Sequence, residues 1–229
     1  MGDDGESCIG RWVSLDEHLR DVSAEAERVA LALALEPRLV KALSVAGRWH
    51  DVGKAHEAFQ TALRKTAGVQ IVPDGLQAKS AIDTSRLTYE TTSGPRPGFR
   101  HELASALAWL QKGESDDLVA YLIAAHHGKV RLSIRSMPNE RKPDDEERRF
   151  ARGVWDDDVL PPIEGLFSDE TSLDLGLMQL GEGSWLSRTL ALRDQWGPFR
   201  LALLETLIRT ADWKASEMER HDALVGVNA

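Results

Sequence analysis

The sequence has 229 residues, of which 42% are hydrophobic and 28% charged, a composition typical of a globular protein and not of a disordered one. Its longest apolar run, residues 29–35, is far shorter than the roughly 20 residues of a membrane-spanning helix, so no membrane partner is expected. Cys8 is the one cysteine, so no internal disulfide can form, and this favours a cytoplasmic protein. Lys and Arg number 28 against 37 Asp and Glu, a net charge of −9, which excludes binding of duplex DNA by bulk positive charge.

Apolar residues recur at helical spacing along most of the chain, and no segment alternates as a half-buried strand does. We therefore predict an all-α fold. Two stretches punctuated by Gly and Pro, 67–99 and 128–182, are expected to be loop-rich insertions. The predicted helices span residues 15–35, 37–49, 55–65, 102–111, 116–127, 184–196 and 198–219.

Histidine and aspartate recur on the apolar faces and at the ends of these helices. His18 lies on the apolar stripe of the first helix, where a lone histidine is more often a packed core residue than a ligand. His50 and Asp51 end the second helix, and a tight turn at Gly53 lets both side chains point to one centre. An imidazole beside a carboxylate suits a divalent transition metal.

Four further residues extend this pattern. His101 opens a helix after a loop rich in Gly and Pro. His126 and His127 close an apolar helix and lean towards its buried side; the alternative is a surface pair stabilised by the helix dipole. Asp212 lies on the apolar face of the last helix, and a buried carboxylate is costly unless it is paired or bound to a cation.

Together these residues predict a buried metal centre assembled from separate helices. A set rich in His with two aspartates favours Mn, Fe, Co or Ni, with Mg or Ca less suited. No cysteine joins the set, which argues against structural zinc.

Several motifs carry a family resemblance. HDVGKAHEAFQ (50–60), FRHELASAL (99–107), LIAAHHGKVR (122–131) and LLETLIRTADWKASE (203–217) resemble the HD nuclease domain of the CRISPR type I helicase–nuclease, within the HD phosphohydrolase superfamily. LDEHLRDV (15–22) is similar to the first-helix histidine motif of that domain, and LQAKS (76–80) followed by FRHE is most similar to subtype I-G, formerly I-U. The resemblance covers about residues 10–219 and implies a single HD domain over 1–229, folded as a helical bundle with long irregular loops.

The resemblance also implies two divalent metal ions that share Asp51. The implied ligands of the first ion are His18, His50, Asp51 and Asp212. The implied ligands of the second ion are Asp51, His101, His126 and His127. Asp51 and Lys54 would be the catalytic residues, with Lys54 stabilising a non-bridging phosphate oxygen. The expected activity is hydrolysis of phosphodiester bonds in single-stranded DNA by a two-metal mechanism during CRISPR interference.

A single strand would be held by a local basic groove. Residues 129–152 carry eight basic and five acidic side chains, so this segment either guides the strand or is a solvated loop of mixed charge. The candidates for strand binding are Arg48, Arg100, Lys129, Arg131 and Arg135.

The sequence lacks a phosphate-binding loop of the form G-x-x-x-x-G-K-S/T, so a helicase domain or chain and a CRISPR effector complex are the expected partners. Two alternatives stay open: an HD phosphohydrolase acting on nucleotides or cyclic dinucleotides, and a non-catalytic module that docks on an effector complex. Trp213 is expected in the core and not as a stacking platform, and neither His56 nor His221 is expected to be a metal ligand.

Overall fold

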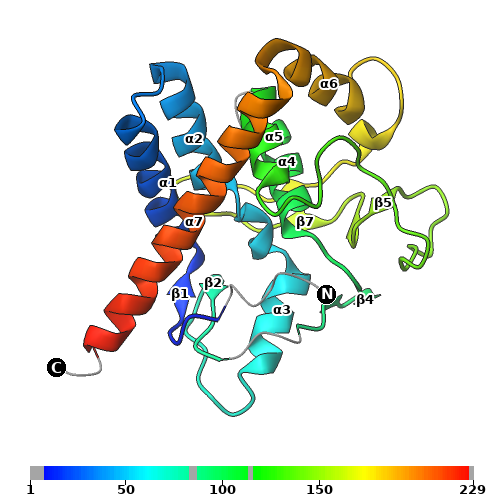
Figure 1. The fold of residues 1–229 in the computed structure, drawn as a ribbon. Coiled ribbons are helices and arrows are strands. Elements are labelled where there is room, and N and C mark those ends of the chain that lie inside the picture. Colours follow the sequence, from blue (N-terminus) through cyan, green and yellow to red (C-terminus); the bar gives the residue numbers. More distant parts are fainter. Residues whose placement is uncertain (1–7, 83–86, 113–115, 227–229) are drawn as a thin grey trace.

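A computed structural model describes residues 8–82, 87–112 and 116–226, with side chains described as far as His221 (Figure 1). The α-helices of the described chain are α1 (Leu15–Ala32), α2 (Pro37–Trp49), α3 (Glu57–Thr66), α4 (His101–Lys112), α5 (Asp117–Ala125), α6 (Trp185–Trp196) and α7 (Pro198–Gly226). Short 3₁₀ helices are η2 (Val52–Ala55) and η3 (Gly176–Met178). None of the described helices is long and apolar enough to cross a membrane.

The predicted helices lie close to the observed ones, and the differences have local causes. The first helix ends at Ala32, three residues early, because Ala34 takes a positive φ of 51°. The helix predicted to include both adjacent histidines ends at Ala125, so His126 is its C-cap. The last helix continues to Gly226, past the predicted end at residue 219.

The all-α prediction is right only in part, because short antiparallel ribbons form within the two loop-rich stretches and between the first stretch and the segment before α1. The strands are β1 (Val13–Ser14), β2 (Gln77–Lys79), β3 (Glu90–Thr91), β4 (Gly94–Pro95), β5 (Phe150–Ala151), β6 (Val154–Trp155), β7 (Val159–Leu160) and β8 (Thr171–Ser172). They pair as β1–β2, β3–β4, β5–β6 and β7–β8. Strands of two or three residues are too short to show an alternating pattern, so they cannot be recognised from a hydrophobic pattern.

The helices pack around one hydrophobic core. In Figure 1, α7 runs across α1 and α2. It contacts both of these helices and α5, and α5 in turn contacts α4. Both loop-rich stretches add buried side chains to the same core, including Ala78, Phe99, Val154 and Leu175. These stretches are therefore packed parts of the molecule and not surface loops alone.

The turn after α2 is locked against α4. A Cβ on Gly53 would lie 2.1 Å from the backbone oxygen of His101, so only glycine permits this approach. The Gly53 N–H donates to Ser105 Oγ (2.7 Å), and that hydroxyl donates to His101 O (2.8 Å). This contact fixes the residues that follow α2 against the first turn of α4.

A buried glutamine holds the neighbouring ribbon in place. The Gln60 side chain donates to Lys54 O (2.8 Å) and Gln77 O (2.9 Å), and its Oε1 accepts from Gln77 N (3.1 Å). Strand β2 is thereby joined to η2, and the β1–β2 pairing sets Lys79 opposite Val13, at the start of α1.

Candidate metal centre

Two groups of buried side chains meet at the end of α2. The first consists of His18 from α1, His50 at the C-cap of α2 and Asp51. His18 Nε2 lies 3.4 Å and His50 Nε2 lies 3.3 Å from Asp51 Oδ2. Asp212 from α7 lies beside this group, with its Oδ1 3.3 Å from His18 Nε2 and 3.8 Å from His50 Nε2.

The second group consists of Asp51, His101, His126 and His127. His101 Nε2 lies 3.0 Å and His126 Nε2 lies 3.6 Å from Asp51 Oδ1. The Nε2 atoms of His101 and His127 are 3.1 Å apart. His127 is partly exposed, whereas the other three residues are buried.

Asp51 belongs to both groups, and its two oxygens face different ones. Oδ2 faces His18 and His50, while Oδ1 faces His101 and His126. The structure thus brings together the residues that the family resemblance implied as ligands of the two ions. Lys54, one turn further on, lies with its Nζ 2.6 Å from Asp51 Oδ2.

The orientation of the imidazoles fits a cation. His50 Nδ1 donates to Gly47 O (2.8 Å) and His126 Nδ1 donates to Ile123 O (2.7 Å), so each Nε2 is left to face the centre. The Nε2 atoms of His18, His50 and His126 are buried and make no hydrogen bond to any described residue. Buried nitrogens without partners are costly, and a divalent transition metal would satisfy them.

Lys79 is a part of the centre that sequence reasoning missed. It is 1% exposed, and its Nζ lies 3.6 Å from Asp212 Oδ1. Lys79 and His18 both face the Asp212 carboxylate directly. The available signal was a lysine in LQAKS between small residues, in a stretch otherwise expected to be loop.

Glu219 is a second residue that the sequence analysis did not single out. It is 2% exposed, and its Oε1 lies 2.7 Å from His18 Nδ1. Seven residues separate it from Asp212, which places both on one face of α7. A carboxylate on one imidazole nitrogen fixes the tautomer and directs the other nitrogen to a metal, so Glu219 is a positioning residue for His18.

The electrostatics of the carboxylates keep them ionised. Burial opposes the charge on Asp51, but the neighbouring His50 and Lys54 hold its pKa well below the usual range. Burial also opposes the charge on Asp212, and there Lys79 is the main group that keeps the pKa low. Both side chains are therefore available as anionic ligands at neutral pH.

The imidazoles of the centre differ in the direction in which their pKa is shifted. Burial opposes a charge on His18, but the neighbouring carboxylates of Asp212, Asp51 and Glu219 raise its pKa to about 9. Burial lowers the pKa of His50, and burial together with adjacent imidazoles lowers the pKa of His127. In the metal-free protein His18 therefore carries a proton at neutral pH, whereas the other two are neutral.

The residues predicted to bind DNA have diverse environments. The Arg48 guanidinium donates to Asp16 Oδ1 (2.7 Å), and Arg100 is largely buried near Glu102, with its Nε 3.9 Å from Glu102 Oε1. Lys129 and Arg135 are exposed.

Arg131 is also exposed and pairs with Glu205 (2.8 Å). Arg131 and His126 line the same cavity. This candidate for DNA binding therefore lies near the metal centre.

Three other expectations can be compared with the structure. Trp213 is 50% exposed, so its placement in the core was wrong: it lies on the face of α7 that turns away from the packed residues Ala211 and Asp212. His56 caps α3, where its Nδ1 accepts from Ala58 N (3.1 Å), and it belongs to neither metal group. His221 is exposed near the end of α7.

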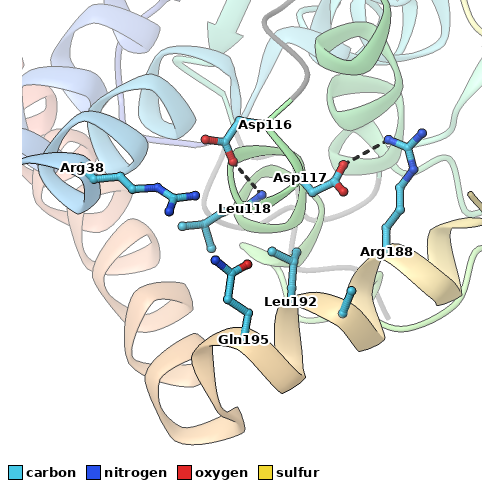
Figure 2. A pocket seen from close by; sticks show the side chains of 8 residues that line it. Arg38, Asp116, Asp117, Leu118, Arg188, Leu192 and Gln195 are labelled. Carbon is cyan, nitrogen blue, oxygen red and sulfur yellow. Dashed lines mark hydrogen bonds and ion pairs between the residues drawn. The ribbon is translucent and has the colours of Figure 1, made fainter.

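A pocket of about 450 Å³ between α2, α5 and α6 is separate from this centre (Figure 2). Its polar groups already serve the fold: Asp116 caps α5 through Leu118 N (2.9 Å), and Asp117 pairs with Arg188 (3.0 Å). None of its lining residues belongs to the metal groups, so it is not the candidate site.

Comparison with known families identifies the chain. A family model described as "Cas3, HD domain" matches residues 2–220. The chain belongs to the Cas3 HD-domain family. No curated protein and no solved structure gives a match. Membership in the Cas3 HD-domain family indicates a metal-dependent HD nuclease of CRISPR systems, with a nucleic-acid substrate and a Cas3 helicase as partner.

We predict that Glu219→Gln in this Cas3 HD domain weakens one of the metal-binding events by about 10–100-fold, the usual effect of losing a carboxylate behind a ligating histidine. Isothermal titration with Mn²⁺ measures it. Glu217→Gln, an exposed neighbour on α7, is the matched control. Equal affinities for the two variants would show that Glu219 does not position His18.

We also predict that metal affinity rises with pH. Imidazole must be neutral to ligate, and the folded-state pKa of His18 is raised from 6.5 to about 9, so protons compete with metal below that pH. The stability of the metal-free fold depends on pH in the opposite direction. Protonated His18 stabilises the fold below pH 6.5, and this contribution is lost as the pH rises through about 9. Titration of Mn²⁺ from pH 5 to 9 should show tighter binding at each step and proton release near neutrality. An affinity that stays constant from pH 5 to 7 would contradict histidine ligation.

Proposed function

We propose that this Cas3 HD domain hydrolyses phosphodiester bonds of single-stranded DNA with two divalent transition-metal ions. The observation that carries the proposal is the shared carboxylate: the two oxygens of Asp51 face two different groups of buried imidazoles. When bound, the ions would supply Lewis acidity and lower the pKa of a water molecule, which is what phosphodiester hydrolysis requires.

Distances within the centre support the proposed ligands. His18, His50, Asp51 and Asp212 would hold the first ion. Asp51, His101, His126 and His127 would hold the second. Mn, Fe, Co or Ni suits these nitrogen-rich sets better than Mg does.

The chain's own residues prepare the centre for an anionic substrate. Lys54 contacts Asp51 and Lys79 contacts Asp212, so each carboxylate already faces a lysine before any cation is bound. Added divalent cations would leave the centre strongly positive, and such a centre attracts phosphate. Asp51 and Lys54 are the proposed catalytic residues. Asp51 would be a ligand of both ions, and Lys54 would hold Asp51 through their ion pair and stabilise negative charge on a phosphate oxygen.

The wider setting is also proposed. The Ala-Lys-Ser and Phe-Arg-His-Glu motifs support subtype I-G. We propose one HD domain over residues 1–229, acting in the cytoplasm beside a helicase and a CRISPR effector complex. Lys129, Arg131 and Arg135 would guide the strand, whereas the bond to Asp16 gives Arg48 a structural role as well.

The test is cleavage of matched single-stranded and duplex oligonucleotides with Mn²⁺, Ni²⁺ or Mg²⁺. We predict cleavage of the single strand, abolished by chelator and reduced more than about 100-fold in Asp51→Asn, because loss of a shared ligand exceeds the 10–100-fold cost of losing an outer-shell partner. Asp74→Asn, which alters an exposed aspartate, is the control and should retain activity.

Other outcomes would reject the proposal in defined ways. Equal cleavage of both DNA forms would contradict single-strand specificity. No cleavage by a protein that binds metal would favour hydrolysis of nucleotides or cyclic dinucleotides, tested with those substrates, or a docking module if these also fail.

A further inference from the structure

Trp213 is half exposed on α7, directly after the metal-centre residue Asp212. It follows Asp212 on α7, so one residue of this pair faces the interior and the other faces solvent. The guanidinium carbon of Arg209, one turn earlier, lies 4.8 Å from the centre of the Trp213 ring. A flat, half-exposed indole with a cation over one face is an arrangement that binds other planar groups well.

A cavity of about 170 Å³ has both Arg209 and the metal-centre residue His126 in its walls. It lies between the end of α5 and the side of α7, two helices that are in contact (Figure 1). Its walls include His126, which belongs to the metal centre, and Arg209, which stacks on Trp213. Arg209 therefore contacts the Trp213 ring and also lines a cavity that reaches His126.

The charges of this cavity suit an anion. Arg131 and Arg209 line it against the carboxylate of Glu205, which already pairs with Arg131 (2.8 Å) and accepts from Tyr121. The Nε of Arg209 is buried and makes no hydrogen bond within the described part of the chain. The cavity thus carries a surplus positive charge in a protein whose net charge is −9.

We propose that Trp213 and Arg209 form a binding site for single-stranded DNA. One base stacks on the exposed part of the Trp213 ring, and a neighbouring phosphate binds Arg209 in the cavity that leads to His126. Aromatic stacking with a positive groove is the usual way in which proteins hold single strands without reading their sequence. The choice of DNA as ligand rests on the proposed function, whereas the aromatic and cationic site rests on the geometry alone.

The experiment measures binding of a fluorescently labelled oligodeoxythymidine strand by anisotropy, with EDTA present so that no cleavage occurs. Trp213→Ala should weaken binding at least about fivefold, the lower end of what one stacked base contributes, and Trp213→Phe should retain part of the affinity. Leu203→Ala is the control, because Leu203 is 49% exposed on the same helix. Arg209→Gln should weaken binding and reduce the slope of log affinity against log salt by about 0.7.

Equal affinity in Trp213→Ala and Leu203→Ala would overturn the proposal and leave the exposed ring to a protein partner. Cleavage kinetics separate this inference from the proposed function. If both are right, Trp213→Ala raises KM and leaves kcat unchanged. If the native chain cleaves no DNA but binds it through Trp213, the nuclease proposal fails and the binding site stands.

Discussion

One carboxylate organises the molecule around it. Asp51 directs its two oxygens at two groups of histidines that come from α1, α2, α4 and the end of α5. This is possible because the chain turns into η2 directly after α2, and that turn presses Gly53 against the backbone of His101. The close approach of η2 to α4 therefore sets the distance between the two halves of the centre.

Burying so many ionisable groups is costly, and the fold offsets the cost by pairing them. Lys54 faces Asp51, Lys79 faces Asp212, and Glu219 faces His18. The partners come from separate elements, so the β1–β2 ribbon and the length of α7 both serve the centre. A helix that ended at Asp212 would leave His18 without its carboxylate.

The same arrangement explains why only part of the site was predictable from the sequence. Histidines and aspartates at helix ends, and Asp212 on an apolar face, are visible in a single segment, because helical spacing reveals which side chains are buried. The helices themselves were predictable for the same reason, within three residues at their ends except where α7 continues to Gly226.

Other features depend on contacts between distant segments. His18 and Glu219 are 201 residues apart, and their hydrogen bond cannot be seen from either segment alone. Spacing did hold one clue, since Glu219 follows Asp212 by two helical turns on the same face. Lys79 is buried because β2 pairs with β1. Strands of two or three residues have no recognisable sequence pattern, so this pairing could not be predicted. Trp213 was misplaced because an aromatic residue beside a buried aspartate looks like core, whereas a rotation of about 100° per residue turns it outward.

The central claim is that two metal ions share Asp51, and anomalous diffraction from crystals grown with Mn²⁺ tests it most directly. We predict two anomalous peaks, one beside His18 and His50 and the other beside His101 and His126, with Asp51 in contact with both. A single peak, or two peaks of which neither contacts Asp51, would contradict it.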